Sequence, residues 1–252
     1  METEFALGDL ANAAARIQCG DMCGSGFQFL REDIILTSRH VIEPLQRDKA
    51  AVVVFTEDGS HCEAKLLAAS TQDEHDFAIL RTSCRLGPSR GVLMPSEVGD
   101  LATGAEVAFA GFPHGISRLL VHRAFVSGRY GNLGFYMDGT VNAGNSGGPV
   151  VDISDGNVVG IVTARRFVGA EDMSTVSNEC ARLEQYLDQV ASGGQVQMRV
   201  GILGLDFAEF AKLLAQSFRI TRRVIDANAN SGIGVGFHIR FALEKCRELG
   251  LC

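Results

Sequence analysis

The residues best suited to do chemistry surround Ser146, in the stretch Gly144-Asn-Ser-Gly-Gly-Pro149. A serine hydroxyl attacks a carbonyl group only when a base takes its proton and N–H groups await the oxyanion. Flanking glycines allow a sharp turn that points backbone N–H groups into one cavity. We therefore predict Ser146 as a nucleophile, with an oxyanion hole spanning Gly144, Asn145 and Ser146 and formed by the N–H groups of the first and last. Taken alone, this hexapeptide also fits an ordinary hairpin turn.

Two residues upstream supply what the serine needs. His40 follows the apolar run Ile34-Ile-Leu36, and histidine is suited to exchanging protons near neutral pH. Asp76 heads the apolar run of residues 77–80, where a buried acid is costly unless hydrogen-bonded, and orienting an imidazole is one such role. A lone histidine after a strand is most often structural, but the order His, Asp, Ser is that of the chymotrypsin arrangement. We predict His40, Asp76 and Ser146 as a catalytic triad.

The composition limits the class of protein. The chain has 252 residues, of which 46% are hydrophobic and 21% charged, as in soluble globular proteins. Its net charge of −7 argues against nucleic acid or an anionic membrane as partner. The sequence offers no signal peptide and no apolar run long enough to span a bilayer, so we expect a cytoplasmic protein. We expect its seven cysteines to be reduced thiols, and no metal or cofactor; a zinc site using Cys19 and Cys23 would lack a second ligand pair.

The elements that must position these residues change in kind along the chain. Residues 17–166 hold short runs rich in Val, Ile, Phe and Ala, separated by turn residues, which predicts an all-β barrel or sandwich. Residues 178–190 and 207–225 show helical spacing of apolar residues. Residues 232–241 return to a strand pattern, and residues 242–249 predict a closing helix. The stretch 5–17 fits a helix, a strand or both.

The motifs together resemble the trypsin-like peptidases of the HtrA (Deg) type. The matching pieces are Gly24-Ser-Gly-Phe, Ile35-Leu-Thr-Ser-Arg-His-Val-Ile, Asp76-Phe-Ala-Ile-Leu, Gly111-Phe-Pro-His-Gly, Asp138 to Pro149, Val158-Val-Gly-Ile-Val-Thr and Gly234-Val-Gly-Phe-His-Ile. The resemblance implies two six-stranded antiparallel barrels, one in residues 1–95 with His40 and Asp76 and one in residues 96–252 with Ser146. A helical insertion at about 169–230 departs from the family pattern, and no PDZ module follows in this sequence.

The resemblance also implies a substrate pocket beside the nucleophile. Thr140 stands where trypsin places the aspartate that selects Lys and Arg, so basic specificity is not expected. The implied pocket residues are Thr140, Val141, Asn142, Val162, Thr163, Ala164 and His238. These walls favour a small or medium apolar P1 side chain, whereas His238 leaves an acidic or amide side chain open.

We therefore expect a serine endopeptidase that hydrolyses proteins or peptides through an acyl-enzyme. Asn145 replaces the aspartate of zymogen-activated relatives, so restraint must come from a partner, a conformational change or narrow specificity. The helical insertion is a candidate lid, oligomer contact or activator site; it also fits a role that only thickens the fold. Two alternatives are a catalytically silent module that binds peptides through the same cleft, and an esterase or acyltransferase that uses the same triad.

Overall fold

The computed structural model describes residues 2–71, 74–87, 90–96, 101–113, 116–166, 170–192, 207–228 and 232–252. Its internal contacts divide the chain into two compact units. The barrel unit comprises Met1–Arg165 and Gly232–Cys252, and the helical unit comprises Arg166–Ser231. All the residues of the predicted triad therefore belong to the barrel unit.

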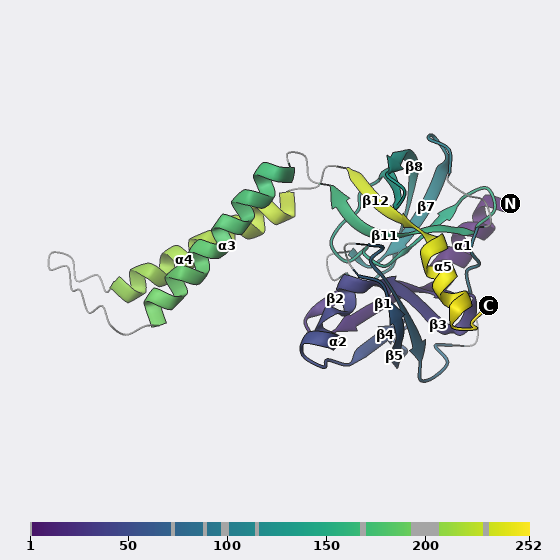
Figure 1. The fold of residues 1–252 in the computed structure, drawn as a ribbon, viewed down its shortest axis with the longest axis horizontal. Coiled ribbons are helices and arrows are strands. Elements are labelled where there is room, and N and C mark those ends of the chain that lie inside the picture. The colour runs from purple at the N-terminus through teal and green to yellow at the C-terminus, as the bar shows by residue number, and fades with distance from the viewer. Residues whose placement is uncertain are drawn as a thin grey trace. The chain divides into compact units, whose positions relative to one another are not determined.

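The barrel unit contains two closed antiparallel barrels of six strands each, drawn from purple to teal and from teal to yellow in Figure 1. In barrel order, the first has β1 (Ala14–Cys19), β2 (Met22–Phe29), β3 (Arg31–Ser38), β6 (Phe77–Thr82), β5 (His61–Ala69) and β4 (Val52–Phe55). The second has β10 (Pro149–Asp152), β11 (Val158–Arg166), β12 (Ile233–His238), β9 (Gly134–Asp138), β8 (Leu120–Tyr130) and β7 (Glu106–Gly111). The expected pair of six-stranded barrels is confirmed.

Three apolar clusters hold these barrels together. One draws only on the first barrel and includes Ile17, Val54 and Leu80. A second draws only on β7–β11 of the second barrel and their connections, and includes Phe109 and Met137. The third combines buried side chains of both barrels with those of the C-terminal helix. Burial of apolar surface therefore fixes each barrel and also joins the two, which is what a site built from both barrels requires.

Helices cover the ends of the barrels. The N-terminal stretch forms both expected elements, since α1 (Glu2–Ala13) runs directly into β1. A 3-10 turn, η1 (Arg39–Ile42), and the short helix α2 (Glu43–Arg47) follow β3. The strand predicted for residues 232–241 ends earlier, because α5 (Ile239–Glu248) begins where Ile239 turns into the shared core.

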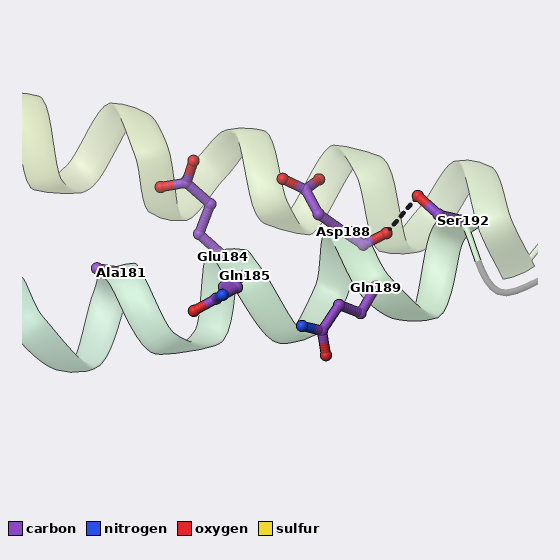
Figure 2. Close-up of a pocket in the computed structure, with 6 residues that line it drawn as sticks. All are labelled: Ala181, Glu184, Gln185, Asp188, Gln189 and Ser192. Carbon is purple, nitrogen blue, oxygen red and sulfur yellow. Dashed lines mark hydrogen bonds between the residues drawn. The ribbon is translucent and has the colours of Figure 1, made fainter. Parts of the chain in front are cut away.

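The helical unit is a pair of helices that lie side by side (Figure 1). They are α3 (Ala170–Ser192) and α4 (Phe207–Asn228), and their place before the last strand is confirmed. Arg219 of α4 donates to Glu184 at 2.7 Å and to Asp188 at 3.3 Å, which ties the two helices together. Figure 2 shows the polar depression on α3, where the Ser192 hydroxyl donates to the Asp188 carbonyl. Among the described residues, neither helix is long and apolar enough to cross a membrane.

The expectation that all seven cysteines are reduced is wrong for one pair. Cys62 and Cys84 form a disulfide, with their Cα atoms 5.9 Å apart. The physical reason lies in the antiparallel ladder of β5 and β6, in which Ala64 faces Thr82. The same register, continued by two residues on each chain segment, sets Cys62 opposite Cys84.

Candidate active site

His40 and Asp76 lie within hydrogen-bonding distance at the open end of the first barrel. His40 sits in η1, just after β3, and its backbone N–H donates to Oδ1 of Asp76 at 3.0 Å. Its ring Nδ1 lies 2.7 Å from Oδ2 of the same carboxylate, which is 3% exposed. An ionised carboxylate can only accept, so Nδ1 carries the proton and Nε2 is left to accept one. This is the tautomer that a general base needs.

Asp76 adopts a backbone conformation that is unusual for a residue with a side chain. Its φ is +43°, in the left-handed region, which costs on the order of 1 kcal/mol or more. A tight turn holds it there, because the N–H groups of Glu74, His75 and Asp76 all point to the Thr71 carbonyl at 3.1–3.3 Å. The Asp76 carbonyl in turn accepts the N–H of Arg39 at 3.0 Å. The conformation aims the carboxylate at His40.

Thr163 of β11 completes the surroundings of the acid. Its hydroxyl donates to Oδ2 of Asp76, and the residue is only 7% exposed. The resemblance placed Thr163 in the wall of the substrate pocket, but its hydroxyl is engaged with the acid instead. Sequence reasoning missed this contact because the partners are 87 residues apart and come from different barrels. The carboxylate thus accepts from three donors and is satisfied although buried.

The loop around Ser146 turns sharply at two glycines. Gly144 has φ +99° and Gly147 has φ +88°, values that favour glycine. The backbone N–H groups of Asn145, Gly147 and Gly148 each donate to a carbonyl of this loop or of β11, at 2.7–3.0 Å. For Gly144 and Ser146 the described residues offer no such acceptor, so these two N–H groups are left for the predicted oxyanion hole. The N–H of Asn145, which we also placed there, is used within the turn.

The glycines after Ser146 also allow a close approach between the barrels. A Cβ on Gly147 would lie 2.1 Å from the Ser25 carbonyl oxygen, and one on Gly148 would lie 2.1 Å from that of Ala110. The Ser25 N–H donates to the Ser146 carbonyl at 2.8 Å, and the Ser25 hydroxyl donates to the Gly144 carbonyl at 2.6 Å. The nucleophile loop is therefore clamped onto β2 of the first barrel, the barrel that carries His40 and Asp76.

The hydroxyl of Ser146 points away from the imidazole. It donates to the Thr163 carbonyl oxygen at 3.3 Å and not to His40. Because a hydroxyl turns freely about its χ1 bond, a change of rotamer suffices to redirect it. Hydrogen bonds of active sites are often long or misaligned until substrate is bound.

Asn145 is fully buried, and neither atom of its side-chain amide has a partner among the described residues. The amide packs against Gly111, where an added Cβ would lie 2.8 Å from Asn145 Oδ1. An aspartate here would place an uncompensated negative charge in the interior, which costs far more than a neutral amide. The neutral residue fits a loop that needs no ion pair to keep its shape.

Residues 24–161, more than half of the chain, match the family described as the trypsin-like peptidase domain. The chain belongs to this family. A probable periplasmic serine endoprotease, DegP-like, of Ectopseudomonas mendocina (strain ymp) is 30% identical over 221 residues, covering 84% of this chain and 44% of the relative. The DegP-like protein of Brucella suis is 29% identical over 204 residues, covering 77% of this chain and 37% of the relative.

Solved structures with the same fold include HtrA-type proteases. The structure titled HtrA-type protease AlgW with tripeptide aligns with a TM-score of 0.62 at 20% identity, over 98% of this trypsin-like peptidase and 63% of AlgW. The serine endoprotease from Yersinia pestis aligns with a TM-score of 0.54 at 24% identity, over 66% of this chain and 58% of that one. These likenesses confirm the chymotrypsin-like fold and the expected resemblance to the HtrA type.

The expectation of a cytoplasmic protein is wrong. The DegP-like relatives are named periplasmic, and the disulfide between Cys62 and Cys84 is typical of an oxidising compartment. The error came from composition and from the start of the sequence, neither of which reports the compartment of a mature protein. The peptidase spans about two fifths of the length of these curated relatives.

The residues predicted for the substrate pocket of this peptidase differ in exposure. Val141 and Val162 are buried, Asn142 is half-buried and Thr140 is exposed. The ring of His238 lies 5.7 Å from that of Phe135. The side chain of Ala164 lies outside the described residues. The assignment of these residues to a pocket stays a prediction.

A cavity of about 360 Å³ lies beside His40 and was not anticipated from the sequence. It is lined by Arg39, His40, Glu43, Gln46, Leu66, Ala69, Ser70 and Thr71. These residues come from η1, α2, β5 and the turn before Asp76, none of which carries a motif that the sequence pattern singles out. The cavity mixes apolar walls with both signs of charge, and it opens directly onto the imidazole.

Proposed function

We propose that this chain is a serine endopeptidase that cleaves protein substrates in the periplasm through an acyl-enzyme, with His40, Asp76 and Ser146 as its triad. The observation that carries the proposal is the 2.7 Å contact of His40 Nδ1 with a buried Asp76, beside a serine loop with two unbonded N–H groups. Membership of the trypsin-like peptidases and the names of the DegP-like relatives support the reaction class and the compartment.

In the first half of the reaction, Nε2 of His40 takes the Ser146 proton as Oγ bonds to the substrate carbonyl carbon. The carbonyl π electrons move to oxygen, and the N–H groups of Gly144 and Ser146 stabilise that oxyanion. The C–N bond then breaks, His40 returns the proton to the leaving amine, and an ester to Ser146 remains. Asp76 stays ionised throughout and stabilises the imidazolium.

In the second half, water replaces the amine. His40 takes a proton from the water as its oxygen attacks the ester, and the same N–H groups bind the second oxyanion. The bond to Ser146 Oγ breaks, Oγ regains its proton from His40, and the new carboxyl product leaves. The hydroxyl, which rests on the Thr163 carbonyl, must turn toward Nε2 before either half can begin. Substrate binding beside Thr163 gives this turn an occasion.

The cavity beside His40 and the predicted pocket residues are proposed to bind the substrate chain on the two sides of the scissile bond. One relative by fold, AlgW, has been solved with a tripeptide, which supports an extended peptide as ligand. The predicted walls favour an apolar P1 side chain, and His238 supports an acidic or amide side chain as the alternative. A P1-scanning peptide library distinguishes the two, and a clear preference for Lys or Arg would contradict both.

The helical unit is proposed to contact an activator or another copy of the chain. In support, α3 and α4 expose large apolar side chains; they are Val176, Leu183, Tyr186, Phe210, Leu213 and Ile220. Deleting residues 171–226 and measuring turnover of a small ester and of a protein substrate tests a regulatory role. Unchanged turnover of both would show that the insertion only thickens the fold.

The proposed function is tested by profiling new N-termini in an unfolded protein mixture treated with the wild type, S146A and H40A. We expect new N-termini with the wild type and a loss of roughly 10⁴-fold or more in both variants. Equal cleavage by wild type and S146A would contradict the proposal. A folded wild type that binds peptides but releases no new N-termini would favour the silent binding module, and cleavage of esters without peptides would favour an esterase.

A further inference from the structure

A ring contact joins the C-terminal helix to the turn that carries the predicted catalytic acid. The rings of His75 and Phe241 are stacked, with centroids 3.7 Å apart and planes 27° apart. His75 immediately precedes Asp76, and Phe241 lies in the first turn of α5. Both residues belong to the barrel unit, although they come from opposite ends of the folded chain.

Phe241 sits on a helix that is held firmly in place. Ile239, Ala242 and Cys246 of α5 are buried in the core cluster that both barrels share. Arg240 donates to the Asn132 carbonyl at 2.5 Å, which fixes the start of the helix to the turn between β8 and β9. The guanidinium of Arg240 also lies 4.9 Å from the centre of the Phe241 ring. Phe241 is therefore an ordered platform for its partner.

His75, in contrast, sits beside a strained residue. Asp76 has φ +43°, and a conformation of this kind persists only where the surroundings over-determine it. The hydrogen bonds of the turn converge on one acceptor, the Thr71 carbonyl, and two of the three are as long as 3.3 Å. The ring of His75 adds a side-chain restraint from outside the turn. Loss of that restraint lets the turn relax and moves the carboxylate away from His40.

We propose that His75 and Phe241 are positioning residues, which hold Asp76 in the conformation that orients His40. This inference rests on the proposed function for its effect on catalysis, but the geometry it concerns exists without substrate. Neither residue touches the reacting atoms. Through β12, the pair also connects the strand that follows the helical unit with the acid of the first barrel.

The first barrel offers a matched control in a second histidine–phenylalanine stack. The rings of His61 and Phe55 lie 5.5 Å apart at an angle of 30°, across β4 and β5 and away from Asp76. H61A removes the same kind of contact without touching the turn. A comparison of H75A and F241A with H61A therefore separates positioning from general stability.

The first measurement follows hydrolysis of a peptide substrate by the wild type, H75A, F241A, the double variant and H61A. A displacement of the acid by a fraction of an ångström to 1 Å is expected to lower kcat by roughly 10-fold to 100-fold with KM little changed. The double variant is expected to resemble the single ones, because both break one contact. H75F and F241Y keep a stacked ring and are expected to restore most of the lost kcat, while H61A stays at the wild-type rate.

The second measurement needs no activity. The low-field proton NMR resonance of His40 Nδ1–H reports the hydrogen bond to Asp76, and it is recorded in S146A. We expect the resonance in S146A and S146A/H61A and its weakening in S146A/H75A and S146A/F241A. An unchanged resonance in both, or kcat values equal to that of H61A, would overturn the inference. If the wild type cleaves no peptide, the proposed function fails while the resonance still decides the positioning role. Should H75A not fold, F241L and H75F carry the comparison.

Discussion

The hydroxyl of Thr163 donates to Oδ2 of Asp76, the same carboxylate oxygen that faces Nδ1 of His40. The second barrel thereby reaches across to the acid of the first barrel. A buried carboxylate depends on such donors, since each lost donor leaves a lone pair unsatisfied. The acid is therefore shared property of both barrels, and the relative position of the barrels enters the chemistry through it.

Replacing Thr163 with valine is expected to lower kcat/KM by roughly 10-fold to 100-fold, because a donor worth about 1–3 kcal/mol is removed from a buried charge. T163S keeps the hydroxyl and is expected to stay near the wild-type rate. Steady-state hydrolysis of one peptide by the three proteins checks this. Equal rates for T163V and T163S would show that the hydroxyl has no part in orienting the acid.

Substitution of Gly147 by alanine is expected to destabilise the fold far more than the same change at Gly59. Both glycines have nearly the same backbone angle, φ +88° and +89°. A Cβ on Gly147 meets the Ser25 carbonyl at 2.1 Å, whereas one on Gly59 meets nothing within 4 Å. G59A should therefore cost only the conformational term of about 1–2 kcal/mol. Urea unfolding of both variants measures the difference, and similar losses would mean that the close approach of the barrels is not tight.

The site shows which interactions a sequence reveals. The Ser146 loop is predictable because its turn, its glycines and its N–H groups lie within six consecutive residues. The pairing of His40 with Asp76 follows from order alone once a barrel is assumed. The contact of Thr163 with Asp76 and the seat of Gly147 on Ser25 depend on how one barrel docks on the other. Docking of this kind leaves no periodic pattern in the chain.

The disulfide predicts a pattern of cysteine reactivity. Exposed Cys23 and Cys252 should react with iodoacetamide in the folded protein. Cys246 should not, because burial raises the pKa of its thiol to about 12. Cys62 and Cys84 should become reactive only after reduction. Peptide mass mapping with and without reductant reads this out, and alkylation of Cys62 without reductant would contradict the pairing.

Loss of the same disulfide is expected to lower the free energy of unfolding. Cys62 and Cys84 are 22 residues apart, and closing a loop of this size is worth about 3 kcal/mol. The C62S/C84S variant should unfold at lower urea concentration than the wild type and should not respond further to reductant. A wild type whose unfolding midpoint is unchanged by reductant would show that the bond contributes nothing.

His122 predicts a loss of stability in mild acid. Burial against Phe109, whose ring lies 4.8 Å away, lowers the pKa of His122 below its usual value, and Nε2 has no partner in the described structure. As pH falls below about 6.5, the unfolded chain binds a proton before the folded one does, so stability present at higher pH is lost. H122F should keep the ring contact and flatten the decline. Urea unfolding at several pH values from neutral to mild acid tests this; parallel declines would exclude His122 as the source.

The larger architecture was predictable to a similar extent. Short apolar runs indicated barrels, and helical spacing indicated α3 and α4, because both signals are periodic. The opposition of Cys62 and Cys84 needs the register of two strands, and the stack of His75 on Phe241 needs the place of α5. Neither can be read from residue spacing. The compartment was misjudged for a related reason, since a disulfide is a tertiary contact.

The central claim, that His40 and Asp76 activate Ser146 beside an oxyanion hole, is tested most directly by a fluorophosphonate probe followed by peptide mass mapping. The account predicts a single covalent adduct on Ser146 of the wild type, none on S146A, and labelling slowed by orders of magnitude in H40A. Folded wild-type protein that takes up no probe, or that carries it on another residue, would contradict the account.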